Sequence, residues 1–279
     1  MHIRFKNYPP WKKVLEVASV LKDNGFSAFV VGGCVRDFLL QREPRDFDMV
    51  TDASTNSLLK LFPKAISIGL PFGVFILPYK NFSIELSSFR KDGPYADGRR
   101  PVEVSAGSIT DDAARRDFSI NALFYNLHTQ EILDFHQGQD DLQNQTIKSV
   151  GLATTRFAED HLRVMRALRF CVELNFSIEE QTKKAILQQA VLLKKISKER
   201  LGAELRKMFS ANLVKALQLL KEYAVLPVLF THFRYADIKE KLAQLDTSNY
   251  LLKPQAAVKS SLCQEQKKQH KLLKPYFLL

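Results

Sequence analysis

One stretch, from Phe29 to Thr51, constrains the fold of this chain more than any other. Its sequence, FVVGGCVRDFLLQREPRDFDMVT, predicts an apolar strand, a Gly-Gly turn, a short helix and a second strand that begins at Asp46. Side chains alternate across a strand, so Asp46 and Asp48 share one face, with Cα atoms roughly 7 Å apart. Two carboxylates about 4 Å apart would repel each other by about 4 kcal/mol at an effective dielectric near 20, so we expect a cation between them. Magnesium is the simplest such cation.

The same stretch also carries the features of a phosphate site. Gly32-Gly33 lets the backbone approach a ligand with no Cβ in the way, and the helix that follows begins with free N–H groups and the positive end of its dipole. Arg36 adds a planar fork of donors that suits phosphate oxygens. A Gly-Gly pair is often only a turn, and most D-x-D pairs bind no metal. The order of strand, Gly-Gly turn, basic helix and acidic strand favours a combined phosphate and metal site.

Length and composition leave room for two ordinary domains. The chain has 279 residues, of which 46% are hydrophobic, and no apolar run approaches the ~20 residues that a membrane-crossing helix needs. The first residues, MHIRFKNYPPW, have too short an apolar run for a signal peptide, so we expect a soluble, cytoplasmic protein. Cys34, Cys171 and Cys263 are widely spaced and lack nearby His partners, which indicates neither a disulfide framework nor a zinc site. We expect them to be small buried hydrophobes.

The net charge of +11 is concentrated in the second half of the chain. Residues 1–150 carry 18 Lys and Arg against 18 Asp and Glu, whereas residues 151–279 carry 23 against 12. Phosphate contacts by Lys and Arg dominate affinity for nucleic acids, so a polyanion is the natural partner of the second half. A basic helical domain with no such partner is the alternative.

Hydrophobic periodicity divides the chain into a mixed α/β part and a helical part. Up to about residue 150 we predict helices at 11–22 and after Ala53, a hairpin turn at 79–81, and strands at 28–31, 46–50, 73–77 and 83–90. Residues 90–101, RKDGPYADGRRP, are rich in Gly, Pro and charge, so we expect a mobile loop. From about Thr154 onward the apolar residues keep helical spacing.

Three further motifs follow the acidic strand. ARRDFSINALFYN carries Arg116, Asp117 and Asn121, with Asn121 one helical turn after Asp117. EDHLRVMRALRF spaces Asp160, Arg163 and Arg166 by three along one predicted helical face, and KERLGAELRK places Glu199, Arg200 and Glu204 on another helix. Taken singly, the first motif also fits an ion pair and cap at a helix start. The second also fits a solvated i,i+3 salt bridge worth a few tenths of a kcal/mol.

In this order the motifs resemble those of the class II tRNA nucleotidyltransferases, the CCA-adding enzymes, and of the related bacterial poly(A) polymerases. The match runs from about Phe29 to Lys207. The resemblance implies an α+β fold, in which a polymerase-β-like nucleotidyltransferase head with a mixed sheet and helices precedes an all-helical neck and body. We therefore expect a catalytic head at 1–150, a neck that recognises the nucleotide base at 151–210, and a short body and tail that bind tRNA at 211–279.

The resemblance also implies roles in the head. Asp46 and Asp48 would hold two Mg²⁺ ions, which can activate an attacking 3′-hydroxyl and stabilise the leaving pyrophosphate. Glu85 stands where the family has a carboxylate on the next strand, although a surface Glu on a strand edge would give the same pattern. The expected contacts to the triphosphate and ribose come from Gly32, Gly33, Arg36, Arg116, Asp117 and Asn121.

Base selection is expected near the start of the helical part. A carboxylate accepts a hydrogen bond from the exocyclic amino group that cytosine and adenine share, whereas uracil and guanine present a carbonyl there. An Arg can donate to the adjacent ring acceptor. By resemblance Asp160 and Arg163 are this pair, supported by Glu159 and Arg166.

The predicted loop at 90–101 resembles the flexible loop of the family, which is thought to help the pocket switch from CTP to ATP. The residues at the familiar places are Asp92, Tyr95, Asp97, Arg99 and Arg100. A loop of this length argues against an enzyme that adds only the two cytidines, and a generic surface loop is the alternative. We expect Glu199, Arg200 and Glu204 to brace the neck, His161 to have no catalytic role, and Trp11 to pack in the core.

The leading hypothesis for function is template-independent addition of CCA to tRNA 3′ ends from CTP and ATP with Mg²⁺. An A-adding enzyme, a poly(A) polymerase and a degenerate RNA-binding module are the alternatives. Residues 68–73 lack the basic run typical of the polymerases, which favours tRNA maturation, and the intact acidic residues argue against a degenerate module. Few residues follow the predicted body helix at 216–230, so tRNA anchoring is open. The basic final segment, QEQKKQHKLLKPYFLL, fits an RNA contact, a packing helix or a dimer contact, and the oligomeric state is also open.

Overall fold

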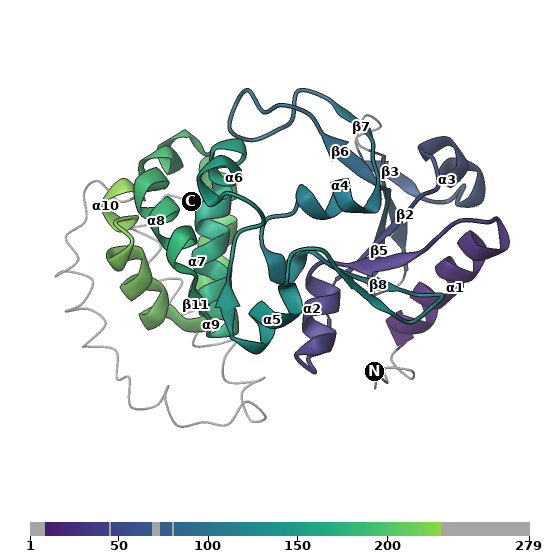
Figure 1. Cartoon of the computed structure of the whole chain (residues 1–279), viewed down its shortest axis with the longest axis horizontal. Helices are drawn as coiled ribbons and strands as arrows, with labels where there is room; N and C mark the ends of the chain where they lie inside the picture. The colour runs from purple at the N-terminus through teal and green to yellow at the C-terminus, as the bar shows by residue number, and fades with distance from the viewer. Residues whose placement is uncertain (1–8, 45, 69–72, 80, 230–279) are drawn as a thin grey trace. The chain divides into compact units, whose positions relative to one another are not determined.

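A computed structural model gives the fold and describes residues 9–44, 46–68, 73–79 and 81–229 (Figure 1). The chain forms two compact units. The first contains the residues up to Asp160 together with Phe176–Thr182, and the second contains His161–Asn175 together with the residues from Lys183 onward. Several sequence predictions lie outside the described residues, namely those on residues 69–72, on Lys80 of the predicted turn, and on Cys263 and the final segment.

The first unit is built on a mixed sheet, with seven strands among the described residues, in the order β3-β4-β5-β2-β1-β8-β9. These strands are β1 (Phe29–Val31), β2 (Phe47–Thr51), β3 (Ile66–Ile68), β4 (Val74–Pro78), β5 (Ser83–Ser88), β8 (Leu123–Asn126) and β9 (Ile132–Asp134). β2 and β5 run parallel, and the other neighbours run antiparallel. The mixed sheet confirms the predicted fold class. The sequence reasoning missed β3, β8 and β9, which are too short to show a clear period of two.

Helices cover both faces of this sheet (Figure 1). On one face Phe29, Val50 and Phe124 form a buried cluster with Ala113 of α4 (Ile109–Ala114). On the other face lie α1 (Pro9–Asp23) and α2 (Gly33–Leu39), whose aromatic side chains reach the sheet. Ring centroids are 4.9 Å apart between Trp11 and Phe38 and 6.5 Å apart between Phe38 and Phe47. Trp11 is therefore a packing residue, as predicted.

The remaining elements of the first unit surround this sheet. They are α3 (Thr55–Leu61), β6 (Arg90–Asp92), β7 (Val104–Ala106), the 3₁₀ turn η2 (Ser119–Asn121), α5 (Gly138–Gln143), β10 (Thr146–Ile147), α6 (Ala153–Glu159) and β11 (Ser177–Ile178). β6 pairs with β7 and a further bridge joins Tyr95 to Pro101, so the segment predicted as a loop at 90–101 is part of a β-hairpin. The prediction was wrong for Arg90–Asp92, which form β6, because their pairing partner lies beyond the Gly- and Pro-rich stretch. The rest of the predicted loop lies in the connection between β6 and β7.

The described part of the second unit is helical, as predicted. It contains α7 (Leu162–Leu174), most of α8 (Glu180–Gln189), the 3₁₀ helix η3 (Ala190–Lys195), α9 (Lys198–Glu222) and α10 (Leu226–Leu229). α7 packs against α9, where the buried Glu204 accepts a hydrogen bond of 2.5 Å from Nε of Arg169. Glu204 thus braces two helices, as expected. Cys34 and Cys171 are both buried, and none of the described helices combines the length and hydrophobicity that crossing a bilayer requires.

Candidate active site

The turn between β1 and α2 lies beside the acidic strand. Gly32 precedes α2 and has φ 71° and ψ −138°, a conformation that L-residues with a side chain rarely adopt. A Cβ added at Gly32 would lie 3.2 Å from Nη1 of Arg116 and 3.5 Å from Oδ2 of Asp48. Gly32, Asp48 and Arg116 therefore meet at one place, although they are far apart in the sequence.

Two carboxylates share one face of the sheet at this place. Asp48 of β2 and Glu85 of β5 are direct partners in the parallel pairing, and Val31 of β1 is the partner of Asp48 on the other side. β5 lies inside the sheet between β4 and β2, so Glu85 is not on an edge strand, although its side chain is exposed at the surface as the alternative interpretation expected. Asp46 is exposed and precedes β2, which begins at Phe47, one residue later than predicted.

The donor set suits a hard cation that shares its ligands with a substrate. No group of three His, Cys, Asp or Glu side chains in the described part of the chain is placed to hold a metal ion by itself. Mg²⁺ is commonly bound by one or two carboxylates together with substrate phosphates and water. Asp48 and Glu85, in register and beside the Gly32 turn, fit that mode of binding.

A chain of buried polar contacts fixes the residues expected to bind triphosphate and ribose. Arg36 donates from Nε and Nη2 to Oδ1 of Asp37 at 2.9 and 2.7 Å, and from Nη1 to Oδ1 of Asn121 at 2.8 Å. Asn121 donates in turn from Nδ2 to Oδ1 of Asp117 at 3.1 Å. The predicted helical turn between Asp117 and Asn121 is a 3₁₀ turn, η2, followed by a strand. These contacts join α2 to η2 across 85 residues of sequence.

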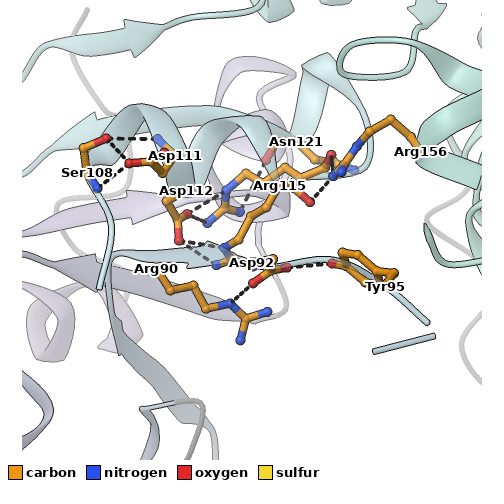
Figure 2. A network of polar contacts seen from close by, with 10 residues as sticks. Arg90, Asp92, Tyr95, Ser108, Asp111, Asp112, Arg115, Asn121 and Arg156 are labelled. Atoms are coloured by element: carbon orange, nitrogen blue, oxygen red, sulfur yellow. Dashed lines mark hydrogen bonds and ion pairs between the residues drawn. The ribbon is translucent and has the colours of Figure 1, made fainter. Parts of the chain in front are cut away.

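Arg116 belongs to a second network, centred on a carboxylate that the sequence reasoning missed. Figure 2 shows this carboxylate, Asp112, beside Arg115. Asp112 of α4 is fully buried and forms ion pairs with Arg115 at 2.6 Å and with Arg116 at 2.9 Å. Burial raises the pKa of Asp112, but Arg116 and Arg115 outweigh burial, and the pKa lies below its ordinary value. Burial lowers the pKa of Arg116, and the guanidinium lies 5.0 Å from the ring centre of Phe124. The i,i+3 and i,i+4 spacing from Asp112 to the two arginines is typical of ion pairs on a helix, and it could have predicted this network from the sequence.

The sequence reasoning also missed Arg156, which lies on α6. Its guanidinium is buried and donates from Nη2 to the main-chain oxygens of Arg115 and of Arg116, the latter at 3.0 Å. Nη1 forms an ion pair with Glu159 on the same helix. Glu159, expected to support base recognition, is thus engaged with Arg156.

The β-hairpin formed by β6 and β7 is held by side chains that were predicted as loop residues. Tyr95 donates from its hydroxyl to Oδ2 of Asp92 at 2.7 Å, and Arg90 pairs with Oδ1 of Asp92 at 3.1 Å (Figure 2). Toward the tip, Oδ1 of Asp97 accepts hydrogen bonds of 2.9 Å from the main-chain N–H groups of Arg99 and Arg100.

A pocket of about 190 Å³ lies between this hairpin, α4 and α6. Its lining residues include Asp92, Tyr95, Arg115, Arg156 and Glu159. The hairpin, the end of α4 and the end of α6 thus border one cavity, which places the expected loop residues beside the Arg115-Arg116 segment.

The residues expected to read the base do not share one helix. Asp160 follows α6 with φ −137° and ψ 105°, and α7 begins only at Leu162. The prediction of one helical face with Asp160, Arg163 and Arg166 was therefore wrong, because the spacing of three continues across a break between helices. Asp160 belongs to the first unit and Arg163 to the second. On α7 Arg163 is buried, and Arg166 lies over the ring of Phe170 at 5.4 Å.

Two parts of the chain match models of known families. Residues 28–148 match the model of the poly A polymerase head domain. Residues 175–236 match a model described as "Probable RNA and SrmB- binding site of polymerase A". The two matches follow each other along the chain.

Individual relatives carry more specific names. A CCA-adding enzyme of Anoxybacillus flavithermus is 39% identical over 249 residues, which are 88% of this chain and 60% of the relative. The Bacillus stearothermophilus CCA-adding enzyme, solved in complex with CTP, has a TM-score of 0.71 at 36% identity and matches 78% of this chain and 53% of that one. A tRNA nucleotidyltransferase, solved with a primer tRNA and an incoming ATP analog, has a TM-score of 0.69 at 28% identity, with coverages of 81% and 66%. The chain thus spans between about half and two-thirds of each of these relatives. With the motifs, the mixed sheet and the Gly32–Asp48–Arg116 arrangement, these matches place the chain in the family of the class II CCA-adding enzymes and bacterial poly(A) polymerases.

Proposed function

We propose that this chain is a template-independent nucleotidyltransferase that adds CCA to tRNA 3′ ends from CTP and ATP, releases pyrophosphate and acts in the cytoplasm. The observation that carries the proposal is the register of β2 and β5, which sets Asp48 beside Glu85 next to the Gly32 turn. A binding module has no need for paired carboxylates on the face where a glycine with positive φ opens space. The names of the relatives support the same activity.

In this proposal Asp46 and Asp48 hold Mg²⁺, with Glu85 as a third carboxylate of the site. Bound there, Mg²⁺ would activate the attacking 3′-hydroxyl and stabilise the leaving pyrophosphate. The residues of the chain itself position the triphosphate and the helix that binds it. Gly32 and Gly33 admit the triphosphate to the N-terminus of α2, and the contacts of Arg36 with Asp37 and Asn121 fix that helix against η2. Arg116 faces the same space as Asp48 and supplies positive charge there.

Base choice and RNA binding are assigned to the residues that follow the head. Asp160 accepts from the exocyclic amino group of cytosine or adenine, and Arg163 donates to the neighbouring ring acceptor, with Glu159 and Arg166 in support. The second unit presents exposed cations that suit an RNA backbone. These are Lys184, Lys194, Lys195, Lys198, Arg206, Lys207 and Lys221. We assign nucleotide recognition to residues 151–210, whose exposed cations also contact the tRNA, and further tRNA contacts to residues 211–279.

The test uses three RNAs: a tRNA that ends before its CCA, the same tRNA ending in CC, and an unrelated RNA. Each is incubated with the full chain, Mg²⁺ and one labelled nucleotide or the CTP and ATP pair, and the products are sized. The proposal predicts two C and one A on the first RNA, one A on the second, and no extension of the third.

Other outcomes point to other members of the family or to none. A single A only on the CC end indicates an A-adding enzyme, and long adenosine tracts on all three RNAs indicate a poly(A) polymerase. No extension of any RNA would contradict every enzymatic assignment, and binding alone would then support an RNA-binding module.

A further inference from the structure

Arg156 joins two segments of the first unit that the proposed function uses for different tasks. It lies on α6, while the main-chain oxygens that accept from its Nη2 belong to Arg115 and Arg116, directly after α4. The carbonyls at the end of a helix have no partners within the helix, and a cation there is favourable for both the hydrogen bonds and the helix dipole. Arg156 therefore holds the C-terminal end of α4 from the side of α6.

The side chains of the two arginines that follow α4 are fixed by Asp112, which lies on α4 itself. The side chains of Arg115 and Arg116 both pair with this buried carboxylate, while their main-chain oxygens accept hydrogen bonds from Arg156. Figure 2 shows Asp112, Arg115 and Arg156 of this arrangement. Nη1 of Arg116 and Oδ2 of Asp48 both lie beside the Gly32 turn, within 3.5 Å of the place that a Cβ at Gly32 would take, and the charge of Asp48 acts to raise the pKa of Arg116. The position of α4's end thus sets the position of a cation in the metal and phosphate site.

At its own end, α6 leads directly into the residue proposed to read the base. The main-chain N–H of Asp160 donates to the main-chain oxygen of Arg156 at 3.4 Å, and Glu159 pairs with the Arg156 guanidinium. One residue therefore contacts Arg116 through its side chain and Asp160 through its backbone. A substitution of Arg156 removes these side-chain contacts while Asp160 and Arg116 themselves stay unchanged in sequence.

We propose that Arg156 is a positioning residue for base selection, which couples Asp160 to the Arg115-Arg116 segment of the phosphate site. This inference rests on the proposed function and adds to it a specificity-determining residue that contacts no substrate. A displacement of ~1 Å at a reacting or recognising group can cost ~100-fold in rate. Loss of the Arg156 contacts should therefore lower discrimination between bases more than it lowers nucleotide binding as such.

The test compares CTP with UTP. The full chain, Arg156→Met, Arg156→Lys and the control Arg42→Met are assayed for kcat/KM with each nucleotide on a tRNA that lacks CCA, and for CTP binding without RNA. Thermal unfolding of each variant is measured alongside. Arg42 is exposed, so its variant makes the same charge change away from these contacts.

We expect Arg156→Met to lower the ratio of kcat/KM for CTP to that for UTP by about tenfold or more. Arg156→Lys should keep part of the preference for CTP over UTP, because an ammonium keeps the charge but not the planar fork. Arg42→Met should have the wild-type preference.

Three results would overturn the inference. If Arg156→Met keeps the wild-type ratio of CTP to UTP, the coupling is absent. If Arg156→Met does not fold, Arg156→Lys decides, and a wild-type ratio in that variant contradicts the coupling. If the wild-type chain neither extends tRNA nor prefers CTP in binding, the proposed function fails, and the coupling fails with it.

Discussion

At the scale of single residues, Asp112 gives a prediction about stability. It is a fully buried carboxylate between two arginines, and removal of one member of a buried ion pair leaves uncompensated charge. We expect Asp112→Asn to lower the free energy of unfolding by about 3–5 kcal/mol. The exposed control Glu43→Gln should stay within about 0.5 kcal/mol of the wild type in chemical denaturation. An Asp112→Asn protein as stable as the wild type would contradict the ion-pair network.

The same carboxylate predicts a dependence of stability on pH. The folded-state pKa of Asp112 lies below its ordinary value of 3.8, because Arg116 and Arg115 outweigh the effect of burial. Its contribution is therefore fully present above the unfolded-state pKa and is lost as the pH falls through the folded-state pKa. Denaturant unfolding between about pH 5 and pH 2 should show a steeper loss of stability in the wild type than in Asp112→Asn. Equal slopes would show that Asp112 does not titrate with unfolding.

Gly138 is a second residue with a testable role, because its surroundings leave no room for a side chain. It lies at the start of α5, and a Cβ there would overlap the main-chain oxygen of Ser119 on η2. The hydroxyl of Ser119 donates to Oδ2 of the buried Asp141 at 2.5 Å, so α5 and η2 are packed closely. We expect Gly138→Ala to cost about 1–3 kcal/mol in chemical denaturation, while Gln139→Ala, exposed on the same helix, should be nearly neutral. A neutral Gly138→Ala would show that α5 is free to move away from η2.

At the scale of elements, sequence reasoning succeeded where the signal was local. The Gly-Gly turn, α2 and the alternation around Asp48 lie within 23 residues, and the structure reproduces their order. Asp112 and Arg156 were missed for different reasons. The partners of Asp112 follow it on the sequence, but nothing local shows that the carboxylate is fully buried. Arg156 meets its main-chain acceptors 40 and 41 residues away, and no periodicity in the sequence predicts such contacts. The spacing of Asp160 and Arg163 wrongly predicted one continuous helix, because no glycine or proline marks the break between α6 and α7 in the sequence.

The helices of the second unit give a prediction about RNA. Lys194 and Lys195 lie at the end of η3, are exposed, and belong to the basic half of the chain. If they contact phosphates, each lost contact should lower the slope of log affinity against log salt by about 1. We expect the double variant Lys194→Gln/Lys195→Gln to bind tRNA more weakly with a shallower salt dependence, as measured by filter binding at several salt concentrations. Lys13→Gln, a charge change on α1 of the head, should bind as the wild type does. Unchanged binding in the double variant would place the RNA elsewhere.

At the scale of the whole molecule, the residues of the proposed activity are divided between two units. Asp46, Asp48, Glu85 and Arg116 lie in the first unit, and the exposed cations proposed to hold RNA lie in the second. Loss of a carboxylate at the metal site should therefore remove chemistry and leave RNA binding intact, because the carboxylates add nothing to phosphate affinity.

The most direct test of this account is single-turnover extension by Asp48→Asn, measured beside its affinity for a tRNA that lacks CCA. The substitution keeps the size of the side chain and removes the charge that would hold Mg²⁺ in register with Glu85. The account predicts that Asp48→Asn binds the tRNA within about twofold of the wild type and adds nucleotides at least ~1,000-fold more slowly, in a reaction that chelation of Mg²⁺ stops in the wild type. An Asp48→Asn protein that adds C, C and A at the wild-type rate would contradict the assignment of the metal site.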